Sequence, residues 1–332
     1  MVTIAIDAMG GDFGPRVTIP SVLSSLEKYP DLNILLYGHR AKLDAYLHQG
    51  TASSRLEIIH TDEQVGSGEK ISAALRKRDS SMRLALDAVR DERAQGMVSA
   101  GNTGALVAIS RYVLKTLLGI DRPALIARLP NLRGYSYMLD LGANVESNSE
   151  NLYQFALMGD AFARVMGVIG APRIALLNIG SEELKGNEDI RLANTALKES
   201  DFLNYVGYIE GDDIYQGVVD VIVTNGYSGN IALKTSEGLL KYVTQVLGQS
   251  FSKNVFTRIL GLMVMPIIEK ARQAFEPELK NSAVLLGVQG IVVKSHGKSQ
   301  QDAFQKAIES AYTLSKNDLL DQISDHLDQE II

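Results

Sequence analysis

Residues 2–12 read Val2-Thr3-Ile4-Ala5-Ile6-Asp7-Ala8-Met9-Gly10-Gly11-Asp12, an apolar run that passes directly into a glycine turn. A loop that follows a strand and opens a helix offers unpaired backbone N–H groups and the positive end of a helix dipole, which suits phosphate or another oxyanion. Similar turns recur at Ser99–Gly104, Leu141–Asn144, Asn178–Ser181, Thr224–Asn230 and Ser295–Ser299. Open α/β sheets bind ligands at the carboxyl ends of their strands, so we expect all six loops to converge on one crevice.

Short β-branched runs alternate with helix-period stretches along most of the chain. The runs are Val2–Ile6, Ile34–Tyr37, Leu56–His60, Met97–Ser99, Tyr137–Leu141, Ile174–Asn178, Val206–Ile209, Val221–Thr224, Val284–Leu286 and Ile291–Lys294. Parallel strands need crossover helices, so this alternation predicts an α/β fold with a largely parallel sheet and helices on both faces. The 332 residues, 45% of them hydrophobic, can bury a large core. We expect a single α/β domain over residues 1–332, although two lobes would also fit this length.

Residues 230–275 differ from the rest, because two helical stretches follow each other around Gly248 to Asn254 without a strand between them. We expect this pair to protrude from the α/β body. Its second member, Val255–Ile268, is apolar nearly all round. Such a helix is typical of a buried core or a dimer interface, and an apolar tip that touches a membrane surface is the alternative.

Composition excludes several classes of protein. The net charge of −6 argues against a sequence-independent grip on nucleic acid, which needs dense Lys and Arg. The absence of cysteine excludes thiol nucleophiles, Cys-ligated zinc and disulfides, and it fits a reducing cytoplasm. The amino terminus has no signal-peptide pattern, and no apolar run is long enough to span a bilayer. We expect no metal site, and we expect His39, His48, His60 and His326 at the surface.

Familiar cofactor and nucleophile motifs do not occur in the chain. There is no G-x-G-x-x-G string opening a helix after a strand, so a nicotinamide cofactor is disfavoured. The loop Ser99–Gly104 is not followed by Gly-Lys-Ser/Thr, so ATP chemistry is not indicated. No Gly-x-Ser-x-Gly turn supports Ser-His-Asp hydrolysis. The carboxylates of Asp7 and Asp12 flank a glycine turn, where they are suited to catalysis but more often hold the turn itself.

Four places in the loops carry candidate chemistry. Ser99–Gly104 combines glycines for close backbone approach with hydrogen-bonding side chains. Lys185 lies between a glycine turn and a helix, where it either neutralises an anion or pairs with Glu182 or Glu183. Asn230 either caps a helix over Ile231–Leu247 or donates to a carbonyl oxygen. His296 is the one histidine of the chain in a glycine turn after an apolar strand.

Taken together, these strings resemble the bacterial acyl-[acyl-carrier-protein]:phosphate acyltransferase family of phospholipid synthesis. The resemblance rests on Asp7–Asp12, Ser99–Ala105, Leu139–Asn144, Asn178–Glu182 with Lys185-Gly186, Gly226–Asn230, Leu285–Gly287 and Lys294–Gly297, and it extends to about Thr313. It implies a fold like that of phosphotransacetylases and isocitrate/isopropylmalate dehydrogenases, a homodimer, and conversion of acyl carrier protein thioester and inorganic phosphate into acyl phosphate without a cofactor. Asn225 departs from the aspartate usual in the family.

The resemblance also implies roles for individual residues. Lys185, Asn230 and His296 become the catalytic contacts for phosphate and the thioester carbonyl. Phosphate and substrate binding falls to Asp7, Gly10, Gly11, Gly101, Asn102, Thr103, Gly104, Asn144, Gly180 and Gly229. Because acyl carrier protein is strongly acidic, a local basic patch is expected to bind it, with Arg111, Lys115, Arg122, Arg128 and Arg133 as candidates. No activated side-chain nucleophile is needed, because phosphate is already a competent nucleophile.

The product suggests where the enzyme works. An acyl phosphate is next used at the membrane by a glycerol-phosphate acyltransferase, so we expect a cytoplasmic protein with weak peripheral contact to the inner face of the cell membrane. Three other functions stay open. A phosphate-binding regulatory module or a phosphotransacetylase-like enzyme would keep the glycine turns, and a dehydrogenase of the related fold would require an adenine-nucleotide site.

Overall fold

The computed structural model describes residues 1–47, 54–252, 260–261, 263–266 and 282–331. The strands are β1 (Val2–Asp7), β2 (Leu32–Gly38), β3 (Leu56–His60), β4 (Gly96–Ser99), β5 (Ala124–Asn131), β6 (Gly134–Leu139), β7 (Ile174–Leu177), β8 (Tyr205–Ile209), β9 (Val221–Val223), β10 (Ala283–Leu286) and β11 (Ile291–Lys294). The helices are α1 (Pro15–Lys28), α2 (Arg40–Asp44), α3 (Ile71–Ala74), α4 (Ser81–Arg90), α5 (Thr103–Leu114), α6 (Ser149–Val165), α7 (Glu188–Glu199), the short η1 (Asp213–Tyr215), α8 (Gly226–Phe251), α10 (Gln301–Lys316) and α11 (Leu319–Ile331).

All strands join one sheet in the order β3-β2-β1-β4-β11-β10-β5-β6-β9-β7-β8. Neighbours are parallel on both sides of the centre, and the three central pairs β11–β10, β10–β5 and β5–β6 are antiparallel. The expected largely parallel sheet is therefore confirmed. β5 was not expected, because Arg128 and Pro130 interrupt its apolar run.

The antiparallel centre corrects the expectation that all six loops share one edge of the sheet. It reverses the strand direction, so β6, β9 and β7 end opposite to β1, β4 and β11. The register of the central strands partly offsets this opposite direction of the two halves. Leu139 at the end of β6 pairs with Ile126, Ile126 pairs with Val284, and Val284 pairs with Val293 near the end of β11. The carboxyl ends of the two halves therefore meet at the same height, in the middle of the sheet.

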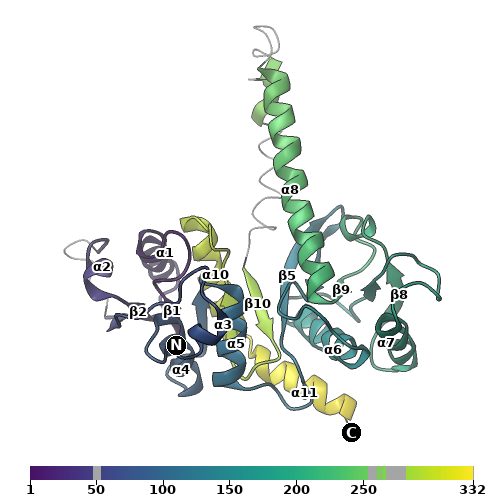
Figure 1. Ribbon diagram of the computed structural model, residues 1–332, viewed down its shortest axis with the longest axis horizontal. Helices are drawn as coiled ribbons and strands as arrows, with labels where there is room; N and C mark the ends of the chain where they lie inside the picture. Colours follow the sequence, from purple (N-terminus) through teal and green to yellow (C-terminus); the bar gives the residue numbers. More distant parts are fainter. Residues whose placement is uncertain (48–53, 253–259, 262, 267–281, 332) are drawn as a thin grey trace.

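Helices cover both faces of the sheet, as expected (Figure 1). Side chains of α1, α6, α7, α10 and α11 pack on one face with Ile4, Val98 and Val293. α4, α5 and the base of α8 pack on the other face, where Leu125 and Met138 point. This second face is where α5 and α8 flank the central strands.

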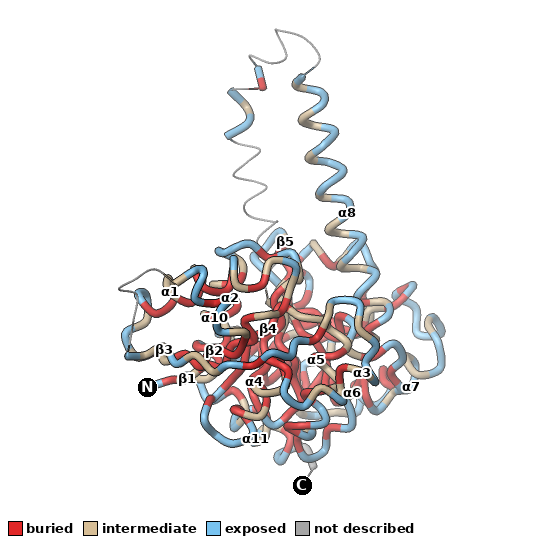
Figure 2. The backbone as a smooth tube through the Cα atoms, turned by 60° about the vertical axis from the view of Figure 1, so that its left-hand side comes forward, coloured by how far each residue is buried: buried red, intermediate tan, exposed pale blue. Residues whose placement is uncertain are grey.

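α8 projects far beyond the body, and its outer part is largely exposed (Figures 1 and 2). The helix begins at Gly226, because the Asn225 side chain accepts a hydrogen bond from the backbone N–H of Ser228 at 2.8 Å. The expectation of a helix start at Ile231 with Asn230 as its cap is wrong for this reason. Most of the predicted second helix, Val255–Ile268, lies outside the described residues.

The base of α8 lies very close to the turn after β6. A Cβ added to Gly229 would lie 2.0 Å from the backbone oxygen of Asp140, and one added to Gly226 would lie 2.2 Å from the oxygen of Asn144. The Asp140 carboxylate accepts hydrogen bonds from the backbone N–H groups of Leu125, Ala143 and Asn144 at 2.7–3.0 Å, which fixes this turn. Glycine at both helix positions therefore permits a backbone contact that sets the direction of α8.

Gly229→Ala is expected to destabilise the protein by about 2 kcal/mol or more, because the methyl group must displace backbone atoms. Gly238→Ala is the matched control in the same helix. A Cβ at Gly238 has no neighbour within 4 Å, so this change should stabilise by roughly 0.5–1 kcal/mol through helix propensity. Urea unfolding followed by circular dichroism measures both free energies. Equal stabilities for the two variants would contradict the close contact.

Candidate active site

Loops from the first half of the sheet enclose a hollow of about 770 Å³. We call it the polar hollow. It is lined by Met9, Gly11, Asp12, Gln64–Ser67, Ala100–Gly104, Lys294 and Gly297. The backbone N–H of Asp12 donates to the oxygen of Gly297 at 2.8 Å, which joins the turns after β1 and β11. The structure thus brings together Gly11, Gly101, Asn102, Thr103 and Gly104, as the sequence predicted.

Asp7 and Gly10 lie behind this hollow. The Asp7 carboxylate is 2% exposed and accepts hydrogen bonds from the hydroxyls of Ser81 at 2.6 Å and Ser99 at 2.7 Å. Burial raises the pKa of this carboxyl, and the two serines oppose the shift. A Cβ at Gly10 would lie 2.7 Å from both Asp7 Oδ2 and the backbone nitrogen of Gly101. Asp7 therefore ties the turns after β1 and β4 together from inside.

Asn102 acts mainly as a helix cap. Its side-chain oxygen accepts from the backbone N–H of Ala105 at 3.0 Å, and its amide donates to the oxygen of Ser67 at 2.8 Å. Thr103 and Gly104, whose N–H groups begin α5 without partners inside the helix, line the polar hollow. The loop Ser99–Gly104 thus offers backbone donors, as its glycines suggested.

A second hollow, of about 360 Å³, lies over the central strands between α5 and α8. We call it the apolar groove. Its floor consists of Leu125, Ala127, Leu129 and Leu141, and its walls carry Thr103, Arg128, Gly142, Asn230, Leu233, Lys234, Glu237, Ala283, Lys294, His296 and Gly297. Alternate residues of β5 point to the same face, which makes the floor continuous. The groove combines residues from both halves of the sheet.

The two hollows meet at Thr103, Lys294 and Gly297, which line both of them. Lys294 ends β11 and is only 8% exposed. Its ammonium donates to the oxygens of Ala100, at 3.3 Å, and Ser295. Burial lowers the pKa of this ammonium to about 8, although the Asp7 carboxylate acts in the opposite direction. The sequence alone assigns no role to Lys294, because an apolar run ending in lysine does not reveal that the lysine is buried.

His296 is half-buried in the wall of the apolar groove. Burial lowers the pKa of its imidazole, and the charge of Lys234 lowers it further. Its Nδ1 accepts a hydrogen bond from the backbone N–H of Lys298 at 3.1 Å. A neutral imidazole that accepts at Nδ1 carries its proton on Nε2, so the ring presents a donor there.

The predicted site residues in the second half of the sheet differ in whether they reach the groove. Asn230 is exposed and lines the groove, where its side chain lies directly beside Gly142. Asn144 is buried, and its amide donates to the oxygen of Pro123 at 2.7 Å and to Asp140 Oδ2 at 2.9 Å. Gly229 packs against Asp140. Asn144 and Gly229 therefore support the turn after β6, with their groups turned away from an anion.

Lys185 and Gly180 do not join either hollow. Their loop follows β7, which is five strand positions from β11, roughly 24 Å at the usual strand spacing. Asn178 holds this loop by donating to the oxygens of Gly180 and Lys185 at 3.1 and 3.2 Å. Glu183 pairs with Lys198 at 2.5 Å, so the surface pair considered for Lys185 with that carboxylate is not formed.

The five basic candidates for carrier docking do not form one patch. Arg111 and Lys115 lie at the far end of α5, and Arg111 is about 12 Å along the helix from Thr103. Arg122 donates to the oxygen of Glu146 at 3.4 Å. Arg128 lines the apolar groove and stacks on Tyr135, and Arg133 lies at the turn between β5 and β6. Of the five candidates, only Arg128 lines the groove, where Lys234 and Lys294 add further positive charge.

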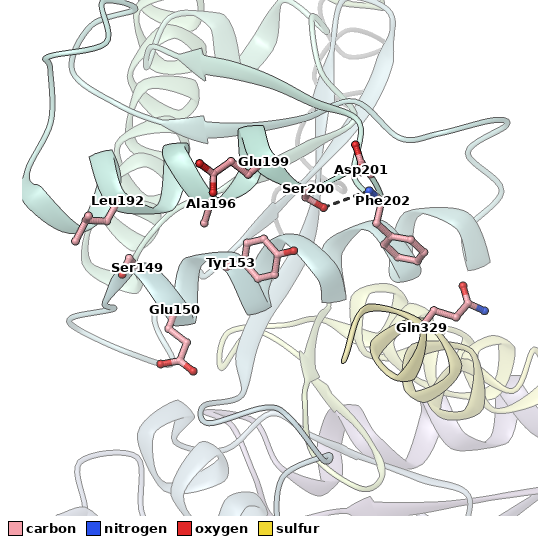
Figure 3. Close-up of a pocket in the computed structure, with 10 residues that line it drawn as sticks. All are labelled: Ser149, Glu150, Tyr153, Leu192, Ala196, Glu199, Ser200, Asp201, Phe202 and Gln329. Atoms are coloured by element: carbon pink, nitrogen blue, oxygen red, sulfur yellow. Dashed lines mark hydrogen bonds between the residues drawn. The ribbon is translucent and has the colours of Figure 1, made fainter. Parts of the chain in front are cut away.

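A further hollow of about 770 Å³ lies between α6, α7 and α11, away from the loops (Figure 3). Its charged lining is acidic, with Glu150, Glu199 and Asp201, so it does not suit an anion. Nearby, His326 corrects an expectation. It is not a surface residue, because its side chain is 12% exposed, 2.8 Å from the buried Asp160 carboxylate, and packed on Phe202. His39 and His60 are partly exposed, and His48 lies outside the described residues.

Comparison with known proteins places the chain in a family. The family described as fatty acid synthesis protein matches residues 2–322. The phosphate acyltransferase of Nitrosococcus oceani is 48% identical over 330 residues, which cover 98% of this chain and 97% of that protein. The phosphate acyltransferase of Legionella pneumophila is 47% identical over 333 residues, covering 99% and 97%.

Solved structures show the same fold at low sequence identity. A phosphotransacetylase from Streptococcus pyogenes superposes with a TM-score of 0.64 at 16% identity, covering 95% of this chain and 94% of that one. A putative 4-hydroxythreonine-4-phosphate dehydrogenase from Salmonella typhimurium gives 0.54 at 14% identity, covering 95% and 100%. The matches over nearly the whole chain identify it as an acyltransferase that belongs to the fatty acid synthesis protein family, together with the phosphate acyltransferases.

Proposed function

We propose that this enzyme transfers the acyl group of an acyl carrier protein thioester to inorganic phosphate, as a step of phospholipid synthesis. The observation that carries the proposal is the junction of two unlike hollows at Thr103, Lys294 and Gly297. Phosphate suits the backbone donors of the polar hollow, and an acyl chain suits the aliphatic floor of the apolar groove. A thioester carbonyl at the junction would lie beside both.

The chemistry needs no further reactant. A phosphate oxygen attacks the carbonyl carbon, a C–O bond forms, and the C–S bond breaks. The proton that hydrogenphosphate loses ends on the departing thiol. The protein therefore has to position the reactants and stabilise the oxyanion of the tetrahedral intermediate.

Residues of the groove supply suitable donors. The Nε2–H of His296 is available to hydrogen-bond the carbonyl oxygen or the leaving sulfur, because Nδ1 is already engaged. The Asn230 amide is a second donor in the lining of the groove. Lys185 keeps its proposed role only as a contribution from a second copy of the chain, because its loop lies five strand positions from His296 within one copy.

Phosphate dependence of thiol release from acyl carrier protein is the direct test of this function. We expect free thiol and acyl phosphate to form together, and only when phosphate is present. Asn230→Ala should lower kcat/KM by at least about tenfold, because one oxyanion donor commonly contributes on the order of 3 kcal/mol. Thiol release that proceeds equally well without phosphate, giving free fatty acid, would make the enzyme a thioesterase.

We further propose that the acidic carrier protein docks beside the β5–β6 hairpin, where Arg128 lines the groove and Arg133 lies at the hairpin turn. The whole chain is acidic, with a net charge of −6, so docking depends on a local excess of positive charge. Arg111, Lys115 and Arg122 lie elsewhere and are secondary candidates.

Reversing charge on the hairpin tests the docking site. Arg133→Glu should raise KM for acyl carrier protein several-fold, leave KM for phosphate nearly unchanged, and lose its effect in high salt. Arg111→Glu, at the far end of α5, is the comparison and should change KM for the carrier less. Steady-state kinetics at two salt concentrations measure these effects. A larger effect of the α5 variant would move the docking surface to that helix.

We propose that residues 230–275 of a single α/β acyltransferase domain serve dimerisation and membrane contact. Leu239, Tyr242, Val243 and Val246 are exposed at helical spacing along α8, an apolar stripe that suits pairing with a second copy. Leu260, Met263 and Met265 are also exposed, farther along the chain. In the described residues, no helix has the length and apolarity to cross a bilayer. Weak contact from the cytoplasmic side would deliver acyl phosphate to a membrane glycerol-phosphate acyltransferase.

Leu260→Glu is expected to abolish flotation of the enzyme with anionic liposomes while the protein stays dimeric and active in solution. The predicted companion site, Leu262, lies outside the described residues. Leu239→Glu, in the α8 stripe, should instead dissociate the dimer. Liposome flotation and light scattering separate the two effects. Dissociation caused by Leu260→Glu would assign that part of the chain to the dimer interface, and the membrane role would be dropped.

A further inference from the structure

We propose that Lys294 holds the phosphate nucleophile, at the junction of the polar hollow and the apolar groove. The inference rests on the acyl transfer to phosphate proposed above, and it assigns the anion site within that reaction. Lys294 ends β11 and lines both hollows together with Thr103 and Gly297. An anion bound there would face the polar loops on one side and the acyl groove on the other.

The geometry leaves the ammonium of Lys294 able to take a ligand. Its Nζ donates to the backbone oxygens of Ala100 and Ser295. An ammonium has three N–H donors, so these two acceptors leave one for a ligand. The two carbonyls also hold the side chain in one position, because they come from the turns after β4 and β11. Lys294 is thus preorganised toward the junction.

The charge balance around Lys294 favours a dianion. The side chain is 8% exposed, and a buried charge is unfavourable unless an opposite charge compensates it. Among the described residues, Lys294 has no carboxylate within ion-pair distance. Asp7 on β1 exerts an electrostatic effect on it, but the Asp7 oxygens bind Ser81 and Ser99. Lys234 on α8 adds repulsion, although it pairs with Glu237 at 3.0 Å, and burial and positive charge lower the pKa of His296 in the same turn. The carboxylates of Asp12 and Glu237 line the two hollows but form no ion pair with Lys294. Phosphate would supply the missing negative charge.

The neighbours of Lys294 complete an anion site. Thr103 begins α5, a helix of 12 residues, and its first N–H groups carry the positive end of the dipole. Gly11 has a φ of +83°, and an added Cβ would lie 2.9 Å from the Cβ of Ala100 and 3.1 Å from the Gly297 oxygen. The loops around Lys294 are therefore too close-packed for side chains, and they present backbone groups to the ligand.

Lys294→Met tests the inference, since it keeps the length of the side chain and removes the charge. We expect KM for phosphate to rise at least about tenfold and KM for acyl carrier protein to change less than about twofold. Lys298→Met is the matched control, because Lys298 is exposed in the same turn and lines neither hollow. Binding of inorganic phosphate to the enzyme, followed by ³¹P line broadening, should be lost in Lys294→Met and kept in Lys298→Met.

The pH dependence gives a test that does not require the charge to be removed. Burial lowers the pKa of Lys294 to about 8, so the charged form disappears as pH rises through that value, while phosphate stays a dianion. KM for phosphate in the natural protein should therefore rise above pH 8. Lys294→Arg, which keeps its proton, should abolish that rise. Melting temperatures show whether each variant is folded.

The outcomes separate this inference from the proposed function. Unchanged phosphate KM and phosphate binding in folded Lys294→Met would overturn the inference while phosphate-dependent thiol release still stood. An alkaline rise that persists in Lys294→Arg would overturn it as well. Thiol release that is independent of phosphate in the natural protein would remove the proposed function itself.

Discussion

The pairing of β5 with β10 and β6 is the constraint on which the rest of the structure depends. It reverses the strand direction at the centre of the sheet, and its register brings Leu139 level with Val293. Without the reversal, the six glycine loops would follow one edge. With it, the loops after β1, β4 and β11 meet the turn after β6 across a floor made by β5. The apolar groove is a direct consequence.

A close backbone contact at the base of α8 places candidate site residues beside these strands. Gly226 and Gly229 let the base of α8 touch the turn held by Asp140, so α8 leaves the sheet along the wall of the groove. Asn230 reaches the groove because it lies one residue beyond this contact. On the opposite wall, Asp7 ties the turns after β1 and β4 to each other. The positions of the candidate donors therefore depend on backbone contacts more than on side-chain packing.

Much of the fold could be predicted from the sequence, because buried strands and glycine turns leave local patterns. β5 could not, since Arg128 and Pro130 interrupt its pattern and its direction depends on partners far away in the chain. The start of α8 was misplaced because Asn225 and Asn230 are equally good caps in sequence, and only the bond to Ser228 distinguishes them. Lys185 illustrates the same limit, because motif spacing does not report the distance between strands. Local sequence does not mark Lys294 as a site residue, because burial of a lysine is a tertiary property.

The location of a bound oxyanion tests most directly the claim that the junction of the two hollows is the reaction site. A crystal of the enzyme soaked with tungstate, a heavy tetrahedral substitute for phosphate, would locate the anion by anomalous scattering. The account predicts a peak within hydrogen-bond distance of Lys294 Nζ, beside Thr103 and Gly297. A peak confined to the loop at Asn178–Asn187, with none at the junction, would contradict it.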